Sequence, residues 1–221
     1  MSQAWVATSN PRRIAEEWKK MPPPGVVIAS NVAGKTVAQA LQRAARPLGV
    51  TVEFITSRAH QCGVRSGYDQ PVQLGPDRWA ALIATWQMCG GPCVVVNAGT
   101  AMTVDALSGD GVFLGGVIVP GVELMRGALA RSTAGLKLQS GGYTFFPATT
   151  ADAIMSGAIN ALAGTVERMQ RFMREAGEAE PRIVLSGGAA PVVERALNGA
   201  VEVVDNLVLE GLLCIAIESK A

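Results

Sequence analysis

The stretch Val96–Asp105, which reads V-N-A-G-T-A-M-T-V-D, is the part of the chain that decides the fold. An apolar run over 93–96 stops at a Gly-Thr-Ala turn, and hydroxyl groups follow at Thr100 and Thr103. Continuous apolar runs of this length are typical of short buried strands. Glycine lets a backbone approach a ligand closely, and the free N–H groups of such a turn can hold an anion. The stretch therefore predicts a phosphate-binding turn between two strands, although Gly-Thr turns without a ligand are also common.

The segments around this turn predict three consecutive strands, at 93–96, 103–107 and 111–119. Strands and helices then alternate: we expect helices near 120–130, 148–176, 191–197 and 207–217, with strands at 183–185 and 201–204. Such alternation indicates an α/β fold. The order β-β-β-α-β-α is that of one half of a ribonuclease-H-like fold, so residues 91–221 are expected to form a C-terminal half of this kind.

The first 90 residues predict an incomplete N-terminal half of the same kind. We expect helices at 11–20, 36–45 and 79–86, strands at 25–30 and 50–55, and an ordered loop over 60–76. A complete half would open with three strands, and here the first clear strand begins only near Gly25. The predicted fold class is therefore α/β with two ribonuclease-H-like halves, the first of which lacks its N-terminal strands.

The composition excludes several classes of protein. The chain has 221 residues, of which 49% are hydrophobic and 17% charged, which is enough apolar material for a large core. Basic and acidic residues number 19 and 18, and no basic block stands out, so a nucleic-acid partner is not indicated. No signal peptide or bilayer-spanning apolar run is visible, and the four cysteines form no C-x-x-C pair. These features predict a soluble cytoplasmic protein with free thiols and no membrane partner.

The segment 67–78, which reads G-Y-D-Q-P-V-Q-L-G-P-D-R, contains the candidate catalytic groups. Tyr68 offers a phenol that can stack on or hydrogen-bond a small ligand. Asp77 stands just before an expected helix, where it is either an N-cap or a general base that takes a proton from a substrate hydroxyl. In the second case Arg78 would hold a carboxylate or another polar group of the substrate.

Three further sites carry weaker signals. Ser186-Gly187-Gly188 follows an expected strand and is either an adenosine-side turn or a plain strand-to-helix connection. Thr149 and Thr150 precede a helix, and one of them is expected to be its N-cap. His60, the only histidine, lies among polar loop residues and is expected to be solvated.

Seven motifs in order along the chain resemble those of the type III pantothenate kinases, including the Bvg-accessory-factor branch. They are S-N-V-A-G (30–34), H-Q-C-G-V-R-S-G-Y-D-Q-P-V-Q-L-G-P-D-R-W (60–79), N-A-G-T-A-M-T-V-D (97–105), F-L-G-G-V-I-V-P-G-V-E-L-M-R-G-A-L (113–129), T-A-D-A-I-M-S-G (150–157), L-S-G-G-A-A (185–190) and L-V-L-E-G-L (207–212). The resemblance covers about residues 25–218. The string Y-x-x-P-x-x-L-G-x-D-R-W is its most specific part.

The resemblance implies an enzyme of the acetate-kinase, sugar-kinase, Hsp70 and actin superfamily. It implies ATP-dependent phosphorylation of pantothenate, the first step of coenzyme A synthesis, by a homodimer that uses Mg²⁺ and a monovalent cation, K⁺ or NH₄⁺. By motif, Asp77 matches the base that activates the pantothenate hydroxyl. The motif positions that match pantothenate contacts are Tyr68, Gly75, Pro76, Asp77, Arg78 and Thr150. Those that match the ATP phosphate turn are Gly99, Thr100 and Ala101.

The sequence departs from the family pattern at two points. The family opens with D-x-G-N-[ST], which binds Mg-ATP phosphates, whereas Ser9-Asn10 here is not preceded by Asp-x-Gly. This difference suggests an N-terminally shortened chain. The second point is Asn97, which stands where the family usually has an Asp metal ligand, and a neutral amide is a weaker ligand for a hard cation than a carboxylate.

Three functions remain open from the sequence. Pantothenate kinase is favoured by the Asp77-Arg78 pair and the Gly-Thr-Ala turn. A non-catalytic kinase-fold protein with a binding or regulatory role is favoured by the absence of the opening phosphate motif. Another small-molecule kinase of the superfamily is the third alternative, and the Y-x-x-P-x-x-L-G-x-D-R string argues against it.

Overall fold

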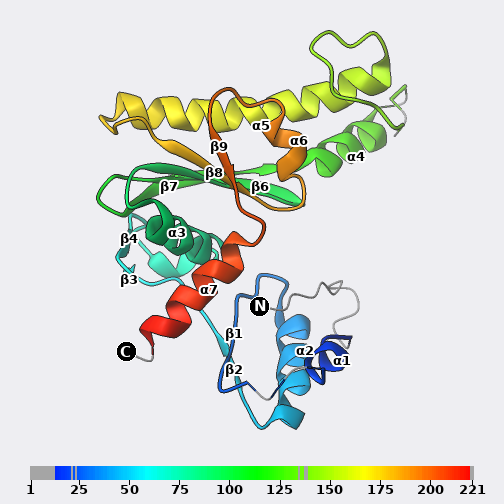
Figure 1. The fold of residues 1–221 in the computed structure, drawn as a ribbon. Helices are drawn as coiled ribbons and strands as arrows, with labels where there is room; N and C mark the ends of the chain where they lie inside the picture. Colours follow the sequence, from blue (N-terminus) through cyan, green and yellow to red (C-terminus); the bar gives the residue numbers. More distant parts are fainter. Residues whose placement is uncertain (1–12, 21, 23, 134, 137–138, 220–221) are drawn as a thin grey trace.

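A seven-stranded sheet between two layers of helices forms the larger part of the molecule (Figure 1). The computed structural model describes residues 13–20, 22, 24–133, 135–136 and 139–219. The strands of this sheet lie in the order β3-β4-β7-β6-β5-β8-β9. Their bounds are β3 His60–Gln61, β4 Val64–Ser66, β5 Cys93–Ala98, β6 Ala101–Leu107, β7 Val112–Pro120, β8 Arg182–Ser186 and β9 Val201–Val203. Strands β5, β6 and β7 are antiparallel neighbours, whereas β8 and β9 continue parallel to β5.

Helices cover both faces of this sheet. The upper face in Figure 1 carries α4 (Val122–Ser132), α5 (Thr150–Glu175) and α6 (Ala190–Glu194), and the lower face carries α3 (Pro76–Cys89) and α7 (Leu207–Glu218). Strand alternation explains the division, because successive side chains point to opposite faces. Val94 and Val96 pack with α5, whereas Cys93 and Val95 pack with α3 and α7. A strand segment buried on both faces is apolar at every position, which is why residues 93–96 of β5 form a continuous apolar run.

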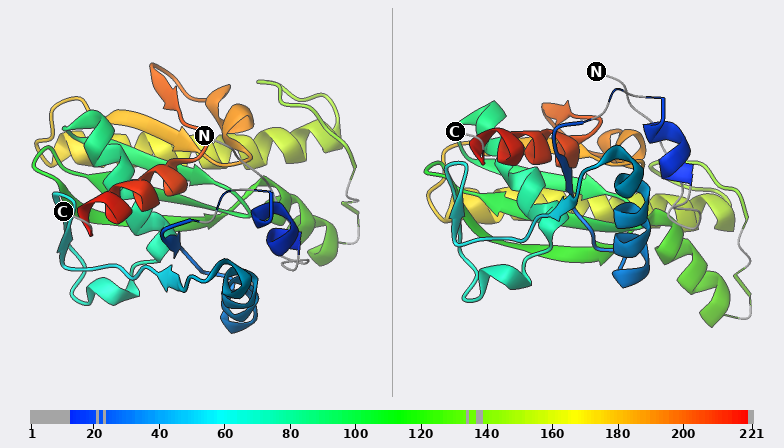
Figure 2. Two further views of the ribbon diagram at one scale, coloured as in Figure 1. Left: turned by 60° about the horizontal axis from the view of Figure 1, so that its bottom comes forward. Right: turned by 90° about the horizontal axis from the view of Figure 1, so that it is seen from below.

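A second, smaller unit lies on the α3 and α7 side of the large sheet (Figures 1 and 2). Strands β1 (Val27–Ala29) and β2 (Val52–Phe54) pair in parallel, and α2 (Lys35–Ala45) connects them as parallel pairing requires. Helix α1 (Arg13–Trp18) packs against α2. Two 3₁₀ turns, at Arg46–Leu48 and Pro71–Gln73, complete the described elements.

The expected mixed α/β architecture is confirmed, and so are the strands around the Gly-Thr-Ala turn and the helices that follow them. The loop expected over 60–76 is wrong at its start, because β3 and β4 form a hairpin there and β4 pairs with β7. The helix expected from Pro120 begins instead at Val122. Pro120 ends β7 opposite Ala101, a position that suits a residue without an N–H.

Two other observations concern the N-terminal residues and the helices. Residues 1–12, which include Ser9-Asn10 and the start of the helix expected at 11–20, lie outside the described part of the chain. Within the described ranges, none of the helices combines the length and the apolar character that crossing a bilayer requires.

Candidate active site

A buried ion pair between Arg78 on α3 and Asp105 on β6 forms the centre of the candidate site. The two residues are only 6% and 1% exposed. Arg78 Nε donates to both carboxylate oxygens of Asp105 at 3.2 Å, and Nη2 donates to Oδ1 through a short bond. The guanidinium therefore meets the carboxylate along its Nε–Nη2 edge, the two-point geometry in which arginine binds carboxylates most strongly.

The environment of this pair affects the two pKa values differently. Burial raises the pKa of Asp105 above the ordinary aspartate value, and the guanidinium of Arg78 opposes this rise. Burial alone would lower the pKa of Arg78, but the hydrogen bonds and charge of Asp105 raise that pKa above the ordinary arginine value. Arginine stays protonated in proteins, and the carboxylate accepts three guanidinium hydrogen bonds. We therefore treat the pair as ionised and internally neutralised.

Tyr68 lies beside the same guanidinium. Its hydroxyl oxygen accepts a hydrogen bond of 3.3 Å from Arg78 Nη1, and its ring centroid is 5.1 Å from that of Phe113 on β7. The preceding Gly67 donates its N–H to the Phe113 carbonyl at 2.9 Å, and a Cβ at position 67 would lie 2.3 Å from that oxygen. The loop that carries Tyr68 is thus tied to β7, and only glycine permits the close approach.

Asp77 lies in the first turn of α3 and is half-buried. The prediction that it is an N-cap is wrong, because the helix begins at Pro76 and Gly75 is the capping residue. Proline suits this first position, since the missing N–H would have no partner inside the helix. Asp77 Oδ1 accepts the backbone N–H of Arg78 at 2.9 Å. Its second oxygen, Oδ2, has no protein hydrogen bond in the described part of the chain.

The Gly-Thr-Ala turn and the Ser186-Gly187-Gly188 turn lie next to each other, because β5 and β8 are parallel neighbours that end together. The Ala189 N–H donates to the Ala98 carbonyl at 3.0 Å, which joins the two turns. Gly187 has a φ of 99°, and a Cβ there would lie 2.4 Å from the Ala98 carbonyl oxygen. Residues Gly99, Thr100 and Ala101 are all exposed, so this turn is open to a ligand.

One face of β6 connects the two groups of candidate residues. Asp105, Thr103 and Ala101 alternate along the strand and so share the face that carries α3. At about 3.3 Å per residue, the distance from Asp105 to the Gly-Thr-Ala turn is roughly 13 Å. Asn97 of β5 pairs with Thr103 of β6 and belongs to the same face. The candidate residues Tyr68, Asp77 and Arg78 and the predicted phosphate turn thus lie along a single surface of the sheet.

Thr150 lies apart from this surface. It is the first residue of α5, is exposed, and belongs to the layer on the opposite face of the sheet. The N-cap of α5 is its neighbour Thr149, whose hydroxyl accepts the Asp152 N–H at 3.1 Å, as expected for one of the two threonines. Within one chain, the structure therefore brings Tyr68, Asp77 and Arg78 together but leaves Thr150 outside the group.

Candidate cation ligands are the next feature of the predicted phosphate turn. Among the described residues, no three His, Cys, Asp or Glu side chains are grouped so that they could hold a metal ion. Asn97 is half-buried, and its Oδ1 lies close to Gly187. A Cβ added at Gly187 would be 2.7 Å from this oxygen. It offers one neutral oxygen at the place where the sequence pattern calls for a carboxylate.

Comparison with known proteins assigns the family. The family model for type III pantothenate kinase matches residues 8–171. The chain belongs to this family. The type III pantothenate kinase of Nitrosospira multiformis is 43% identical over 220 residues, which cover 100% of this chain and 84% of that protein. The type III pantothenate kinase of Aromatoleum aromaticum is 49% identical over 195 residues, which cover 88% of this chain and 80% of that protein.

A solved structure supports the fold of this type III pantothenate kinase family member. A conserved Campylobacter jejuni protein, described as a Baf family transcriptional activator, superposes with a TM-score of 0.58 at 20% identity. The superposition covers 93% of this chain and 88% of that protein. At this identity the similarity extends to the fold alone.

Sequence reasoning missed Asp105 as a site residue of this family member. The residue closes the V-N-A-G-T-A-M-T-V-D stretch, but no role was assigned to it. A signal was present, since a carboxylate followed by Ala106 and Leu107 interrupts a strand that is otherwise suited to burial. An acidic residue in such a strand is almost never fully buried unless it is paired, so a basic partner for Asp105 was to be expected.

Proposed function

We propose that this protein transfers a phosphoryl group from ATP to the hydroxyl of pantothenate, the first step of coenzyme A synthesis. Family membership supports the substrates, and one structural observation supports the site. Asp77 and the Arg78–Asp105 pair lie on the same sheet face as the exposed Gly-Thr-Ala turn, so acceptor and donor can bind along one surface. Phosphoryl transfer depends mainly on such alignment and on charge stabilisation.

In this proposal Asp77 is the general base. Oδ1 is held by the Arg78 N–H, which leaves Oδ2 to accept the proton of the pantothenate hydroxyl as the oxygen attacks the γ-phosphorus. Tyr68 and Arg78 contact the rest of pantothenate, and Gly75 and Pro76 bring the backbone of the loop close to it. A Cβ at Gly75 would lie 2.6 Å from Asp77 Oδ1, so a larger residue there would displace the base.

ATP binds, on the same proposal, at the joined turns. Gly99, Thr100 and Ala101 hold phosphate oxygens, and Ser186-Gly187-Gly188 lies on the adenosine side. Mg²⁺ bound together with ATP at these turns would supply neutralisation of the phosphate charge. Mg²⁺ in such sites is held by one or two protein groups together with substrate phosphates, so a three-residue protein cage is not required.

A coupled assay for ADP release tests the function. Purified protein is given ATP, Mg²⁺ and K⁺ with and without pantothenate, and the phosphorylated product is identified by mass spectrometry. Pantothenate-dependent ADP release is the expected result. Pantothenate binding by calorimetry without any ADP release would contradict the kinase and favour the non-catalytic binding protein.

We also propose that residues 1–90 and 91–221 correspond to two ribonuclease-H-like halves. The order β7-β6-β5-β8-β9, with the first three strands antiparallel and the last two parallel to β5, supports this assignment for the C-terminal half. In this division β4 and α3 belong by sequence to the first half but pack on the sheet of the second. Helix α3 then places the residues of the 67–78 loop against that sheet.

We predict that Asn97→Asp strengthens the dependence of activity on K⁺. A carboxylate binds a hard cation better than an amide, and position 97 lies beside the phosphate turn. The measurement is the half-saturating K⁺ concentration, with NH₄⁺ as a second cation, and we expect it to fall several-fold. Thr103→Ser, a conservative change on the paired strand position, serves as the control, and identical K⁺ titrations for Asn97→Asp and wild type would refute the prediction.

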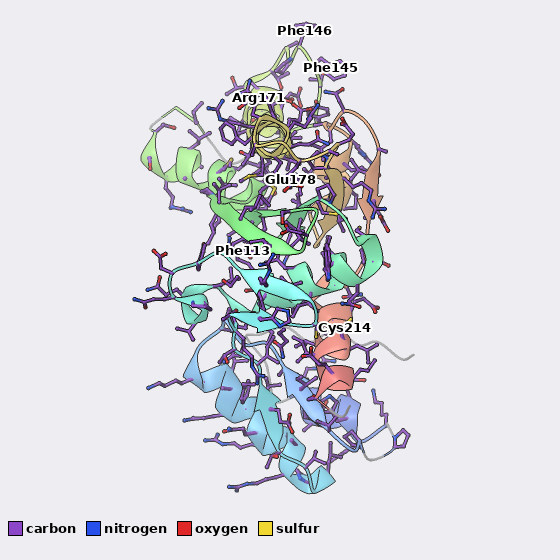
Figure 3. The ribbon with its side chains drawn as sticks, turned by 90° about the vertical axis from the view of Figure 1, so that its left-hand side faces the viewer. Phe113, Phe145, Phe146, Arg171, Glu178 and Cys214 are labelled. Carbon is purple, nitrogen blue, oxygen red and sulfur yellow. The ribbon has the colours of Figure 1, made fainter. Side chains whose placement is uncertain are left out.

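We propose a homodimer as the active form, in which the partner chain supplies Thr150. Several large apolar side chains on the α5 side of the molecule are exposed: Val117 39%, Leu124 42%, Leu129 40%, Phe145 78% and Phe146 93%. Figure 3 shows Phe145 and Phe146 at the outer end of the molecule, away from the sheet. Exposed apolar groups gathered on one side are typical of a protein–protein contact.

This proposal predicts complementation between two impaired variants. Thr150→Val should raise the KM for pantothenate, and Asp77→Asn should lower kcat by about 10²- to 10⁴-fold. A mixed dimer of the two variants contains one site with both native residues if Thr150 acts across the dimer, so co-expression should restore up to half of the wild-type activity per dimer. Mixing Asp77→Asn with Thr149→Ala is the matched control, and a mixture no more active than Thr150→Val alone would place Thr150 outside the partner's site.

A further inference from the structure

Asp105 is a carboxylate for which the proposed reaction has no direct role, yet it lies almost out of contact with solvent. It is 1% exposed, and among the described residues the side-chain hydrogen bonds to its oxygens all come from Arg78. Burying a carboxylate is unfavourable unless it is paired with good geometry. Since apolar residues of similar volume often stabilise a protein equally well, the pair is better explained by what it positions than by stability.

The hydrogen bonds give the guanidinium of Arg78 two different edges. One edge is held by Asp105, and the other, which includes Nη1, lies toward Tyr68 and still has N–H donors. Asp105 holds Nε and Nη2, and Nη1 donates to the Tyr68 hydroxyl. Because arginine has more N–H donors than these bonds use, donors remain on the side of Nη1 and Tyr68. The same residue's backbone N–H holds Asp77 Oδ1. Arg78 thus connects Asp105 to both acceptor-side groups.

Gly116 of strand β7 leaves room for this arrangement. Gly116 lies opposite Asp105 in the antiparallel pairing. A Cβ at this position would lie 2.0 Å from Asp105 Oδ1 and 2.8 Å from Arg78 Nη2. The backbone is also close, since the same Cβ would lie 2.7 Å from the Val104 carbonyl oxygen. The ion pair is therefore packed directly against the main chain of β7, which restricts its position.

We propose that Asp105 is a positioning residue for pantothenate, acting through Arg78 and Tyr68 without touching the substrate. Fixing the Nε–Nη2 edge makes the guanidinium present its Nη1 side, together with the phenol, to the acceptor. The negative charge of Asp105 also neutralises Arg78 locally. The acceptor site therefore distinguishes pantothenate from other molecules by the direction of hydrogen bonds more than by net charge. This inference rests on the proposed pantothenate kinase activity.

Two variants test this role, one that removes the charge of Asp105 and one that displaces the ion pair. Asp105→Asn keeps the size of the side chain and removes its charge, and Gly116→Ala keeps both charges and displaces the pair. For each we expect the KM for pantothenate to rise at least tenfold, with the KM for ATP within twofold of wild type. Asp110→Asn, on an exposed carboxylate paired with Arg65, is the control and should match wild type.

Thermal melting and near-UV circular dichroism accompany the kinetics. A folded Asp105→Asn protein with an unchanged KM for pantothenate would overturn the positioning role while leaving the proposed kinase intact. Equal rises in the KM for pantothenate and for ATP would also overturn it. If both variants lose the cooperative melting transition, Asp105 serves the fold and the inference fails. Wild-type protein without pantothenate-dependent ADP release would instead reject the proposed function itself.

Discussion

Asp77→Asn is expected to lower kcat with pantothenate by about 10²- to 10⁴-fold, the usual contribution of a general base. The asparagine carbonyl can still accept the Arg78 N–H that Asp77 Oδ1 accepts now, so the first turn of α3 should be preserved. What the amide lacks is a basic oxygen for the proton of the attacking hydroxyl. The measurement is single-turnover and steady-state ADP release, with thermal melting to verify the fold.

A matched control lies in the same loop. Asp69 is exposed and makes no described side-chain hydrogen bond, so Asp69→Asn removes a carboxylate without touching the site. We expect this variant to keep wild-type kcat. Asp77→Asn with activity within tenfold of wild type would show that another group takes the proton.

Gly211→Ala is expected to reduce the free energy of unfolding by about 3 kcal/mol, at the upper end of the range for overpacked sites. Helices α3 and α7 cross at this glycine, where an added Cβ would lie 1.9 Å from the Ala80 carbonyl oxygen and 2.4 Å from its carbonyl carbon. These atoms belong to a helix backbone and cannot rotate away, so the two helices must separate. Urea unfolding followed by far-UV circular dichroism measures the loss.

Gly157→Ala provides the opposite expectation in another helix. Gly157 lies in α5, is exposed, and would place its Cβ in open space. Alanine is the better helix former by about 1 kcal/mol, so this variant should be slightly more stable than wild type. If Gly211→Ala behaved like Gly157→Ala, the close crossing of α3 and α7 would be wrong.

The pattern of apolar residues predicted the elements that are buried and long. Residues 93–96 of strand β5 form an unbroken apolar run because α5 covers one face of the strand and α3 and α7 the other. The hairpin of β3 and β4 was missed because its strands are short and polar and because its turn is Cys62-Gly63. Both turn residues have positive φ, 48° and 82°, and the usual sequence signal for such a turn is Asn-Gly or Asp-Gly.

The 67–78 part of the candidate site was predictable from the sequence, but Asp105 and the relations between the site residues were not. Tyr68, Asp77 and Arg78 fall within one short segment, so local sequence was sufficient to group them. The contact between Arg78 and Asp105 joins residues 27 positions apart, and it depends on how α3 lies across β6, which no local pattern encodes. The location of Thr150 on the opposite face likewise depends on the crossing of the chain from β7 to α5.

Two backbone hydrogen bonds have a common consequence. One runs from the Ala189 N–H to the Ala98 carbonyl, and the other from the Gly67 N–H to the Phe113 carbonyl. They attach the proposed nucleotide turns and the proposed acceptor loop to strands of the same sheet. The entropy of aligning two reactants is a large part of many reaction barriers. On the proposed function, the groups that bind the two substrates are already aligned by the sheet when the chain has folded. Less entropy is then lost in aligning the reactants during each catalytic cycle.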